Sequence, residues 1–452
     1  MDVPATAADG LEVHRPGSGR YARATAPDNS SGAQHPVAVV APGNGAQVSA
    51  AVRLAAERGW MIAPQATGHG AAGDIGPDTL LIDTSALDQI SIDPGTATAR
   101  AGAGVVWAAL ERAAEPHGLL GRAGTSPSVG VAGYTFGGGV GWLARPHGLA
   151  AAHLHAVDFV DAAGRRRRAA ADADEPGDRD AWWAFRGGGG AGIAVSLEFG
   201  LVPVADLWAG YLLWPAGELG AVAAAWSTAL PAFGPALTSD LSLLYAAPGP
   251  PFPPELRGQP VVHLSVASSA GPGEAAALFG ALDRLAKPVV STWGPSDAER
   301  LGGIHLDPPP GIPAYGGGQW LTDGTPAVAE DILRAALAPG TPLKVIEIRH
   351  VGYDDPAAGQ LPAAGGAMTR PPGPFLVHAV GVGPGPAQRA QLDQALETVW
   401  AAAAAAGTGR AAPPFAEGQR SPGSALSAPD QSNLAAVRSA IDPHGIIRTA
   451  RR

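Results

Sequence analysis

Two hydrophobic patterns divide the chain at about residue 202. Before this point, a β-branched run over residues 36–42 is followed by apolar residues at helical spacing over 45–59 and by a short apolar run over 60–63. The outer runs predict buried strands and the middle one predicts a helix. Such a strand-helix-strand unit is typical of layered folds that combine helices with sheets.

The remaining patterns extend this division. In the first part we expect buried or alternating strands at 79–83, 90–93, 96–102 and 195–202 and a helix at 104–116. In the second part, strand-like runs alternate with alanine-rich helices, which favours an α+β domain with an antiparallel sheet. We expect residues 1 to about 35 to be a loosely ordered lead-in. The second-part strands are expected at 208–214, 241–245, 261–266, 345–350 and 375–382, and the helices at 218–229, 274–285, 327–338, 388–406 and 433–441.

Three glycine-dense stretches, at 64–73, 124–142 and 185–195, carry the candidate chemistry. Small side chains let a flat or extended ligand lie against the backbone, and a loop after a strand offers free N–H groups. The first stretch places His69 between two glycines. The third contains Gly187-x-Gly189-x-x-Gly192, but a strand follows it where a dinucleotide fingerprint needs a helix. The sequence therefore disfavours a Rossmann site.

Composition excludes several classes of protein. The 452 residues suffice for two to three domains, and the net charge of −10 argues against a nucleic-acid partner. The basic run at 165–168 borders acidic residues and is interpreted as a solvated hairpin end. The cysteine count of 0 removes disulfides and thiolate ligands. No metal is expected, because no histidines stand at ligand spacing. Without a signal peptide or a membrane-length apolar run, we expect a cytoplasmic protein with no membrane contact.

Five motifs occur in order along the chain: Gly68-His69-Gly70, Gly124-Thr125-Ser126-Pro127, Gly137-Gly138-Gly139-Val140-Gly141-Trp142, Arg186-Gly187-Gly188-Gly189-Gly190 and Asp442-Pro443-x-Gly445-Ile446-Ile447. Together they carry a family resemblance. The chain resembles the FAD-linked oxidases of the vanillyl-alcohol oxidase superfamily, specifically the berberine-bridge-enzyme-like branch. The resemblance implies an α+β, two-domain, PCMH-type FAD-binding fold, with a substrate domain built on an antiparallel sheet flanked by helices. The FAD-binding domain would be 1–202, completed by 403–452, and the substrate domain 203–402.

The resemblance implies FAD as cofactor, joined to the protein by a single covalent link through His69, with a non-covalently bound flavin as the alternative. Many relatives add a second link from a cysteine, but this chain has Ser126 at that position and no cysteine, so a bicovalent flavin is excluded. The family's longer glycine run is shortened here to Gly190-Ala191-Gly192. The expected cofactor-binding residues are Ala66, Thr67, Gly68, His69, Gly70, Gly73, Gly124, Thr125, Ser126, Val129, Gly130, Gly133, Tyr134, Gly138, Gly139, Gly141, Trp142, Gly192, Ile193 and Val195.

The catalytic base is less clear from the sequence. Many relatives place a tyrosine near the C-terminal tail, where this chain has Phe415, which cannot take a proton. The catalytic candidates are Tyr134, His305, Glu347 and Glu417. Alternation puts Glu347 and Arg349 on the same face of a strand, so pairing with each other is the role we expect first for these two.

The resemblance implies an oxidase that removes hydride from a C–H next to oxygen or nitrogen, with molecular oxygen as acceptor. A weakly charged, tryptophan-containing second domain favours a small, apolar or aromatic substrate, and analogy suggests secondary metabolism. Two alternatives stay open: cyclisation or rearrangement without net oxidation, and a degenerate flavin-binding protein without turnover. The protein would be a monomer or homodimer. The tryptophans concerned are Trp208, Trp214, Trp226, Trp293 and Trp320.

Overall fold

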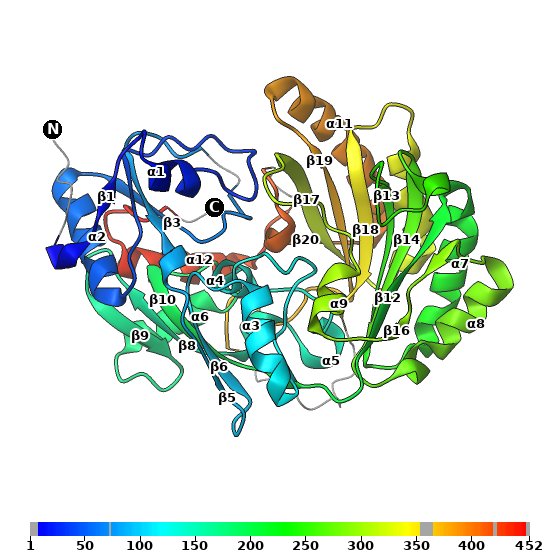
Figure 1. Cartoon of the computed structure of the whole chain (residues 1–452), viewed down its shortest axis with the longest axis horizontal. Helices are drawn as coiled ribbons and strands as arrows, with labels where there is room; N and C mark the ends of the chain where they lie inside the picture. Colours follow the sequence, from blue (N-terminus) through cyan, green and yellow to red (C-terminus); the bar gives the residue numbers. More distant parts are fainter. Residues whose placement is uncertain (1–7, 72–73, 353–364, 419–422, 449–452) are drawn as a thin grey trace.

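The chain forms two lobes that lie side by side (Figure 1). The computed structural model describes residues 8–71, 74–352, 365–418 and 423–448. The first lobe holds the N-terminal half and the last helix, and the second holds the large sheet and its helices. None of the helices in these described ranges has an apolar stretch long enough to span a bilayer.

The first lobe begins with a small mixed sheet. Strand β4 pairs in parallel with both β2 and β3, because helix α2 carries the chain back between β2 and β3. Asn44 caps the start of α2 through its side chain, and Gly59 ends the helix in the left-handed conformation, with φ of 66°. The elements are β1 (Val13–His14), α1 (Gly19–Ala24), β2 (Ala38–Val40), α2 (Gly45–Arg58), β3 (Met61–Gln65) and β4 (Thr79–Asp83).

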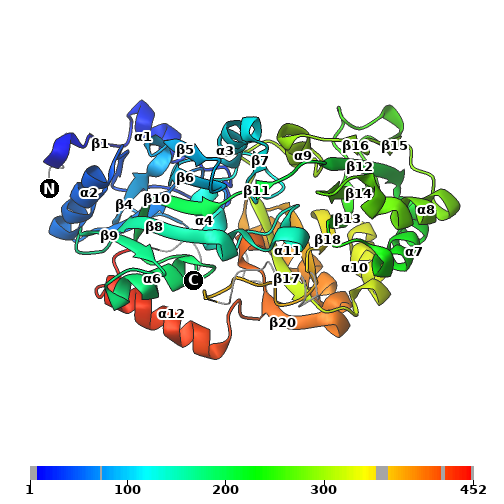
Figure 2. The same cartoon turned by 90° about the horizontal axis from the view of Figure 1, so that it is seen from below.

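A second, antiparallel sheet completes this lobe, in the order β5-β6-β10-β8-β9. Helix α2 contacts strands of both sheets. On the side seen in Figure 2, helices α6 and α12 cover the second sheet and contact each other. The elements are β5 (Ile90–Asp93), β6 (Thr98–Gly102), α3 (Trp107–Ala114), β7 (Leu119–Leu120), α4 (Val131–Phe136), α5 (Ala144–His147), β8 (Leu154–Val160), β9 (Arg166–Ala170), α6 (Pro176–Phe185), β10 (Ile193–Gly200), β11 (Val202–Pro203) and α12 (Ala428–Ile441).

The second lobe is a nine-stranded sheet, in the order β15-β12-β14-β13-β18-β19-β17-β20 with β16 beside β12. Its apolar face packs against helices α7, α8, α10 and α11. The elements are β12 (Trp208–Pro215), α7 (Leu219–Ala229), β13 (Leu237–Tyr245), β14 (Pro260–Ser268), α8 (Ala276–Leu285), β15 (Val290–Ser291), β16 (Gly294–Pro295), α9 (Ala298–Gly303), β17 (Ala314–Leu321), α10 (Ala329–Arg334), β18 (Leu343–His350), β19 (Phe375–Val382), α11 (Pro386–Ala403) and β20 (Gly407–Ala411).

Two features depart from the sequence expectations, and one agrees with them. The described part of the lead-in is ordered: β1 pairs with β2, and α1 begins at a cap formed by Ser18. The basic run agrees with the expected hairpin end: it leads from the turn after β8 into β9, Arg165, Arg166 and Arg168 are exposed, and its arginines pair with Asp158, Asp161, Asp178 and Glu198. Strand β20 follows the expected domain boundary at residue 403, yet it pairs with β17 in the large sheet.

Candidate functional site

A cavity of about 330 Å³ lies between the two lobes. Small residues of the first lobe line one side, and ionisable residues of the second lobe line the other. Thirteen of the expected cofactor-binding residues line it, so the structure brings most of that set together. They are Ala66, Thr67, Gly68, His69, Gly70, Gly124, Thr125, Ser126, Val129, Gly130, Gly133, Tyr134 and Gly192.

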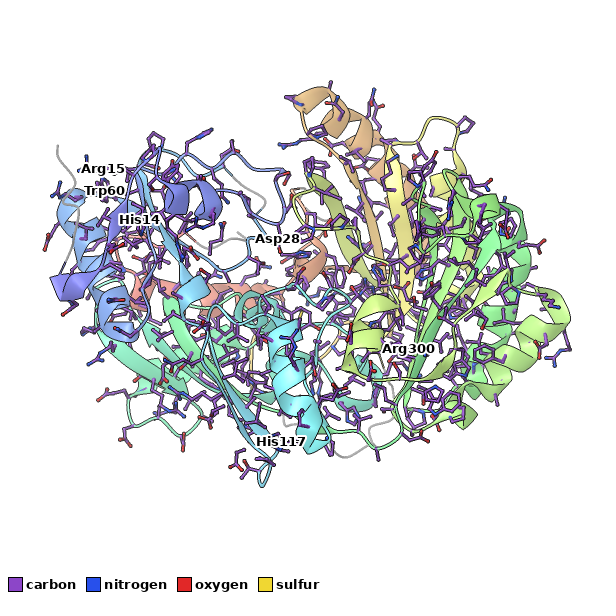
Figure 3. All side chains as sticks on the ribbon, viewed as in Figure 1. His14, Arg15, Asp28, Trp60, His117 and Arg300 are labelled. Carbon is purple, nitrogen blue, oxygen red and sulfur yellow. The ribbon has the colours of Figure 1, made fainter. Side chains whose placement is uncertain are left out.

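The first glycine loop is held from behind by the lead-in. Gly68 has φ of 71°, and a Cβ built on it would lie 2.4 Å from the Cβ of Pro27. Only glycine suits this position, because both the backbone conformation and the contact exclude a side chain. The Asp28 N–H donates to the Thr67 carbonyl at 2.9 Å. Asp28 lies at the seam between the lobes (Figure 3), so the lead-in fixes the loop that carries the half-buried His69.

The second glycine stretch opens the cavity to a ligand. Gly133 lies in helix α4, and a Cβ built there meets no described atom within 4 Å. A side chain on Gly133 would therefore stand in free space at the cavity wall. An extended ligand could lie against this helix backbone, which fits a flavin cofactor.

Six of the expected cofactor-binding residues do not line the cavity, and Gly73 lies outside the described residues. Close packing explains the glycines among them instead. A Cβ on Gly141 would lie 1.8 Å from the Ala123 carbonyl oxygen, and one on Gly139 would lie 2.6 Å from the Cβ of Ala150. The six residues are Gly138, Gly139, Gly141, Trp142, Ile193 and Val195.

The opposite wall is the polar face of the large sheet. Strand β18 contributes Glu347 and Arg349, which alternate onto the same face. The antiparallel register places His378 of β19 opposite Glu347, and Asp240 of β13 opposite Arg349. His305, from the segment after α9, lies over them. Neighbouring strands thus bring together charged residues that are far apart in sequence.

These side chains form a chain of alternating carboxylates and imidazoles. Asp307 Oδ1 lies 2.7 Å from His305 Nδ1, and Glu347 Oε2 lies 2.5 Å from His305 Nε2. Glu347 Oε1 lies 3.0 Å from His378 Nδ1. His378 Nε2 lies 3.7 Å from Glu417 Oε1. The chain begins and ends at residues that line the cavity, Asp307 and Glu417.

The expected pair of Glu347 and Arg349 is present, with Arg349 Nη2 at 2.6 Å from Glu347 Oε1. Burial alone would raise the pKa of the Glu347 carboxyl, but the charges of Arg349 and His305 outweigh it and hold that pKa well below its ordinary value. Burial and the Glu347 charge raise the pKa of Asp240. Glu347 is therefore the anionic centre of this cluster.

Carboxylate partners raise the pKa values of the two histidines, His378 and His305. Burial alone would lower the pKa of His378, but its hydrogen bond to Glu347 and the nearby charge of Glu417 raise that pKa to about 9. Burial alone would raise the pKa of Glu417, and His378 lowers it below its ordinary value. Asp307 and Glu347 raise the pKa of His305 well above its ordinary value, against the effect of burial. The carboxylate partners thus favour the protonated form of both imidazoles.

The four catalytic candidates differ in their surroundings. Glu417 lines the cavity, whereas Glu347 is fully buried behind it. Both ring nitrogens of His305 are taken by carboxylates. Tyr134 packs edge-on against Trp107, and burial raises the pKa of its phenol further above its ordinary value. Tyr134 is therefore poorly suited to accept a proton.

Sequence reasoning did not single out His378, Asp307 or Asp240. The signal for His378 was a polar residue within the apolar run of β19. Phe415, at the position where relatives place a tyrosine, packs against His378 at 5.1 Å between ring centroids and beneath the Arg349 guanidinium. Ligand atoms of Asp240, His305 and Glu347 lie within 4.8 Å of one another, but their charges are paired within the protein and call for no metal ion. Arg349 already supplies positive charge to both carboxylates.

Comparisons with known proteins agree with this site. Residues 36–170 match a family described as FAD binding domain. Berberine bridge enzyme-like D-2 of Nicotiana tabacum is 33% identical over 180 residues, which are 37% of this chain and 31% of that protein. The aclacinomycin-N/aclacinomycin-A oxidase of Streptomyces galilaeus is 36% identical over 160 residues, 34% of this chain and 29% of that protein. The matched segment thus spans about a third of the length of these curated relatives.

The fold extends the similarity to nearly the whole chain. The solved structure of Physcomitrella patens BBE-like 1 superimposes with a TM-score of 0.81 and 20% sequence identity, covering 98% of this chain and 96% of that one. Both lobes therefore share the architecture of that protein, although the sequence similarity is concentrated in the first lobe.

Proposed function

We propose that the chain belongs to the berberine-bridge-enzyme-like branch of the FAD-linked oxidases and is an FAD-dependent oxidase of a small molecule, because residues 36–170 match an FAD binding domain and the fold matches that of BBE-like 1. The observation that carries the proposal is the cavity between the lobes. Glycines and other small residues line one side of it, and ionisable side chains line the other. Bound FAD would supply a two-electron acceptor. Oxygen as the final acceptor, the secondary-metabolite role and the cytoplasmic location are parts of the proposal that rest on the sequence.

The loops of the first lobe would hold the cofactor. The segments around Thr67, Thr125 and Gly133 line one side of the cavity with small residues. His69 lies in the first of these segments and is the residue we propose for a single covalent link. Ser126, whose hydroxyl lies 3.3 Å from the Ser128 hydroxyl, lines the same cavity without offering a thiol.

The wall of the second lobe would orient the substrate and accept its proton. Glu417, Asp307 and Arg349 all line the cavity. A hydroxyl or amine on the reacting carbon can donate a hydrogen bond to either carboxylate, which would place the adjacent C–H toward the first lobe. Removal of the proton by this wall does not require the tyrosine that Phe415 replaces.

The substrate's reacting end is therefore expected to be polar. The tryptophan argument for an apolar or aromatic substrate loses its basis, because none of the five tryptophans lines the cavity. Trp214, Trp226 and Trp320 are fully buried in the protein core. An apolar or aromatic body remains compatible with the small-residue loops around Gly133.

The flavin content of the purified protein tests the proposal. We expect a yellow protein whose colour stays in the acid-precipitated pellet and moves to the supernatant, or is lost, in His69→Ala. Anaerobic mixing with aclacinomycin, benzylic alcohols and secondary amines would then identify compounds that bleach the flavin absorbance. A wild-type protein that purifies without flavin, and does not take it up when FAD is added, would contradict the proposed function.

A further inference from the structure

One buried ring nitrogen in the ionisable wall is not satisfied by the protein. His378 Nε2 is buried and has no hydrogen-bond partner among the described residues. The group in front of it is Glu417, whose Oε1 lies 3.7 Å away and whose side chain is 15% exposed at the cavity. A buried imidazole nitrogen without a partner needs an explanation, because such atoms are almost always hydrogen-bonded.

The other ring nitrogen is firmly held. His378 Nδ1 lies 3.0 Å from Oε1 of the fully buried Glu347. A buried carboxylate on Nδ1 fixes the ring orientation and stabilises the imidazolium form, which is how carboxylates support histidine bases in hydrolases. By contrast, both ring nitrogens of His305 already have carboxylate partners, so neither is left free for a group in the cavity.

We propose that His378 receives the substrate's proton through Glu417, with Glu347 as the carboxylate that orients its ring. This inference rests on the proposed oxidase function and concerns only the proton. The X–H bond of the substrate breaks, its electron pair stays on X, and an O–H bond forms on Glu417. That proton then passes to His378 Nε2, which restores the Glu417 carboxylate and leaves the imidazolium between two carboxylates.

The surrounding charges fit this role. The groups that face His378 are Glu347 on β18, Glu417 after β20, and Arg349, which is bonded to Glu347 and stacks on Phe415. The carboxylates raise the pKa of His378 to about 9 and His378 lowers the pKa of Glu417. Glu417 alone is a weak base, whereas the neutral form of His378 is a strong one. The rate of substrate oxidation should therefore rise about tenfold per pH unit below pH 9, as the neutral form becomes populated.

The kinetic test uses flavin reduction by whichever compound of the panel bleaches the wild-type protein. We expect His378→Gln to slow reduction by about 10²-fold or more and to abolish its rise with pH, while substrate affinity changes little. His155→Gln makes the same substitution at an exposed histidine of β8 and should keep both the rate and the pH profile. Retention of the rising pH profile in His378→Gln would overturn the inference.

A second measurement needs no substrate. In a ¹⁵N NMR titration of the histidine rings, the His378 signal should titrate near pH 9 in the wild type and at a lower pH in both Glu417→Gln and Glu347→Gln. A His378 signal that titrates at the same pH in all three proteins would refute the inference even if the oxidase function holds. A wild-type flavin that no compound reduces would instead count against the proposed function, and the NMR result would still decide the state of His378.

Discussion

At the scale of single residues, the absence of a side chain at Gly133 leaves room for a cofactor in the cavity. It lies in helix α4 outside the left-handed region, and a Cβ on it meets no atom. Gly133→Leu should therefore fold, since leucine favours helices, but its side chain should fill the cavity. We expect little or no flavin in the purified variant, measured by absorbance, together with an unchanged or higher apoprotein melting temperature.

Gly217→Leu provides the matched control for this substitution. Gly217 is also exposed, and a Cβ there also meets no atom within 4 Å, but it lies outside the cavity lining. This variant should keep the wild-type flavin content. Full flavin content in Gly133→Leu would show that the cofactor does not lie against α4.

His378 also makes stability depend on pH. Its folded-state pKa of about 9 lies above the ordinary value of 6.5, so its contribution is complete below pH 6.5 and is lost as the pH rises through 9. The wild type should exceed His378→Gln in unfolding free energy by about 3 kcal/mol more at pH 6 than at pH 9.5. Urea unfolding of both proteins at the two pH values measures this. A difference in unfolding free energy that is the same at both pH values would contradict the raised pKa of His378.

At the scale of elements, the sequence predicts strands well where β-branched residues are dense. Strands β4 and β19 agree with the expected ranges to the residue. Strand β17 was missed because it contains three consecutive glycines, which carry no strand signal. The structure gives their reason: a Cβ on Gly318 would lie 2.6 Å from the Cβ of Phe415, so the glycine lets the Phe415 segment approach the sheet.

The candidate site was predictable only where its residues are neighbours in sequence. The glycine loops and the pairing of Glu347 with Arg349 follow from local spacing and alternation. The partnership of Glu347 with His378 depends on the register between β18 and β19, which no local pattern specifies. The contact between Asp240 and Arg349 likewise depends on the register between β13 and β18.

The C-terminal motif supports the strand that leads into the first glycine loop. Asp442, at the end of α12, accepts hydrogen bonds from the N–H groups of Ile446 and Ile447 at 3.0 and 2.7 Å. The tail then pairs with Ile62 of β3, the strand that leads to His69. Asp442→Ala should lower the unfolding free energy by about 1–3 kcal/mol and speed the release of any flavin that is not covalently bound.

Chemical denaturation and flavin fluorescence measure these two effects of Asp442→Ala. Asp442→Asn keeps one acceptor oxygen and should lie between the wild type and the alanine variant. Equal stability of all three proteins would mean that the tail does not support β3.

At the scale of the whole molecule, a buried arginine helps to join the two lobes. Arg145 of helix α5 is 6% exposed and donates across the interface to the carbonyls of Gly234, Leu237 and Gly352, with 3.0 Å to the first. Arg145→Met keeps the length of the side chain but leaves these buried carbonyls without that donor. Because hydrogen bonds from charged groups are the strong ones, the loss should be about 2–4 kcal/mol.

The cavity lies between the lobes, so loosening this contact should also affect the site. Arg145→Met should unfold at lower urea concentration and bind flavin less tightly, whereas Arg23→Met, at an exposed arginine of α1, should change the unfolding free energy by no more than about 0.5 kcal/mol. Loss of stability with unchanged flavin affinity would mean that the first lobe alone holds the cofactor. A loss of both stability and flavin affinity would mean that the second lobe helps to bind the flavin through its position. This lobe carries the wall of alternating carboxylates and imidazoles.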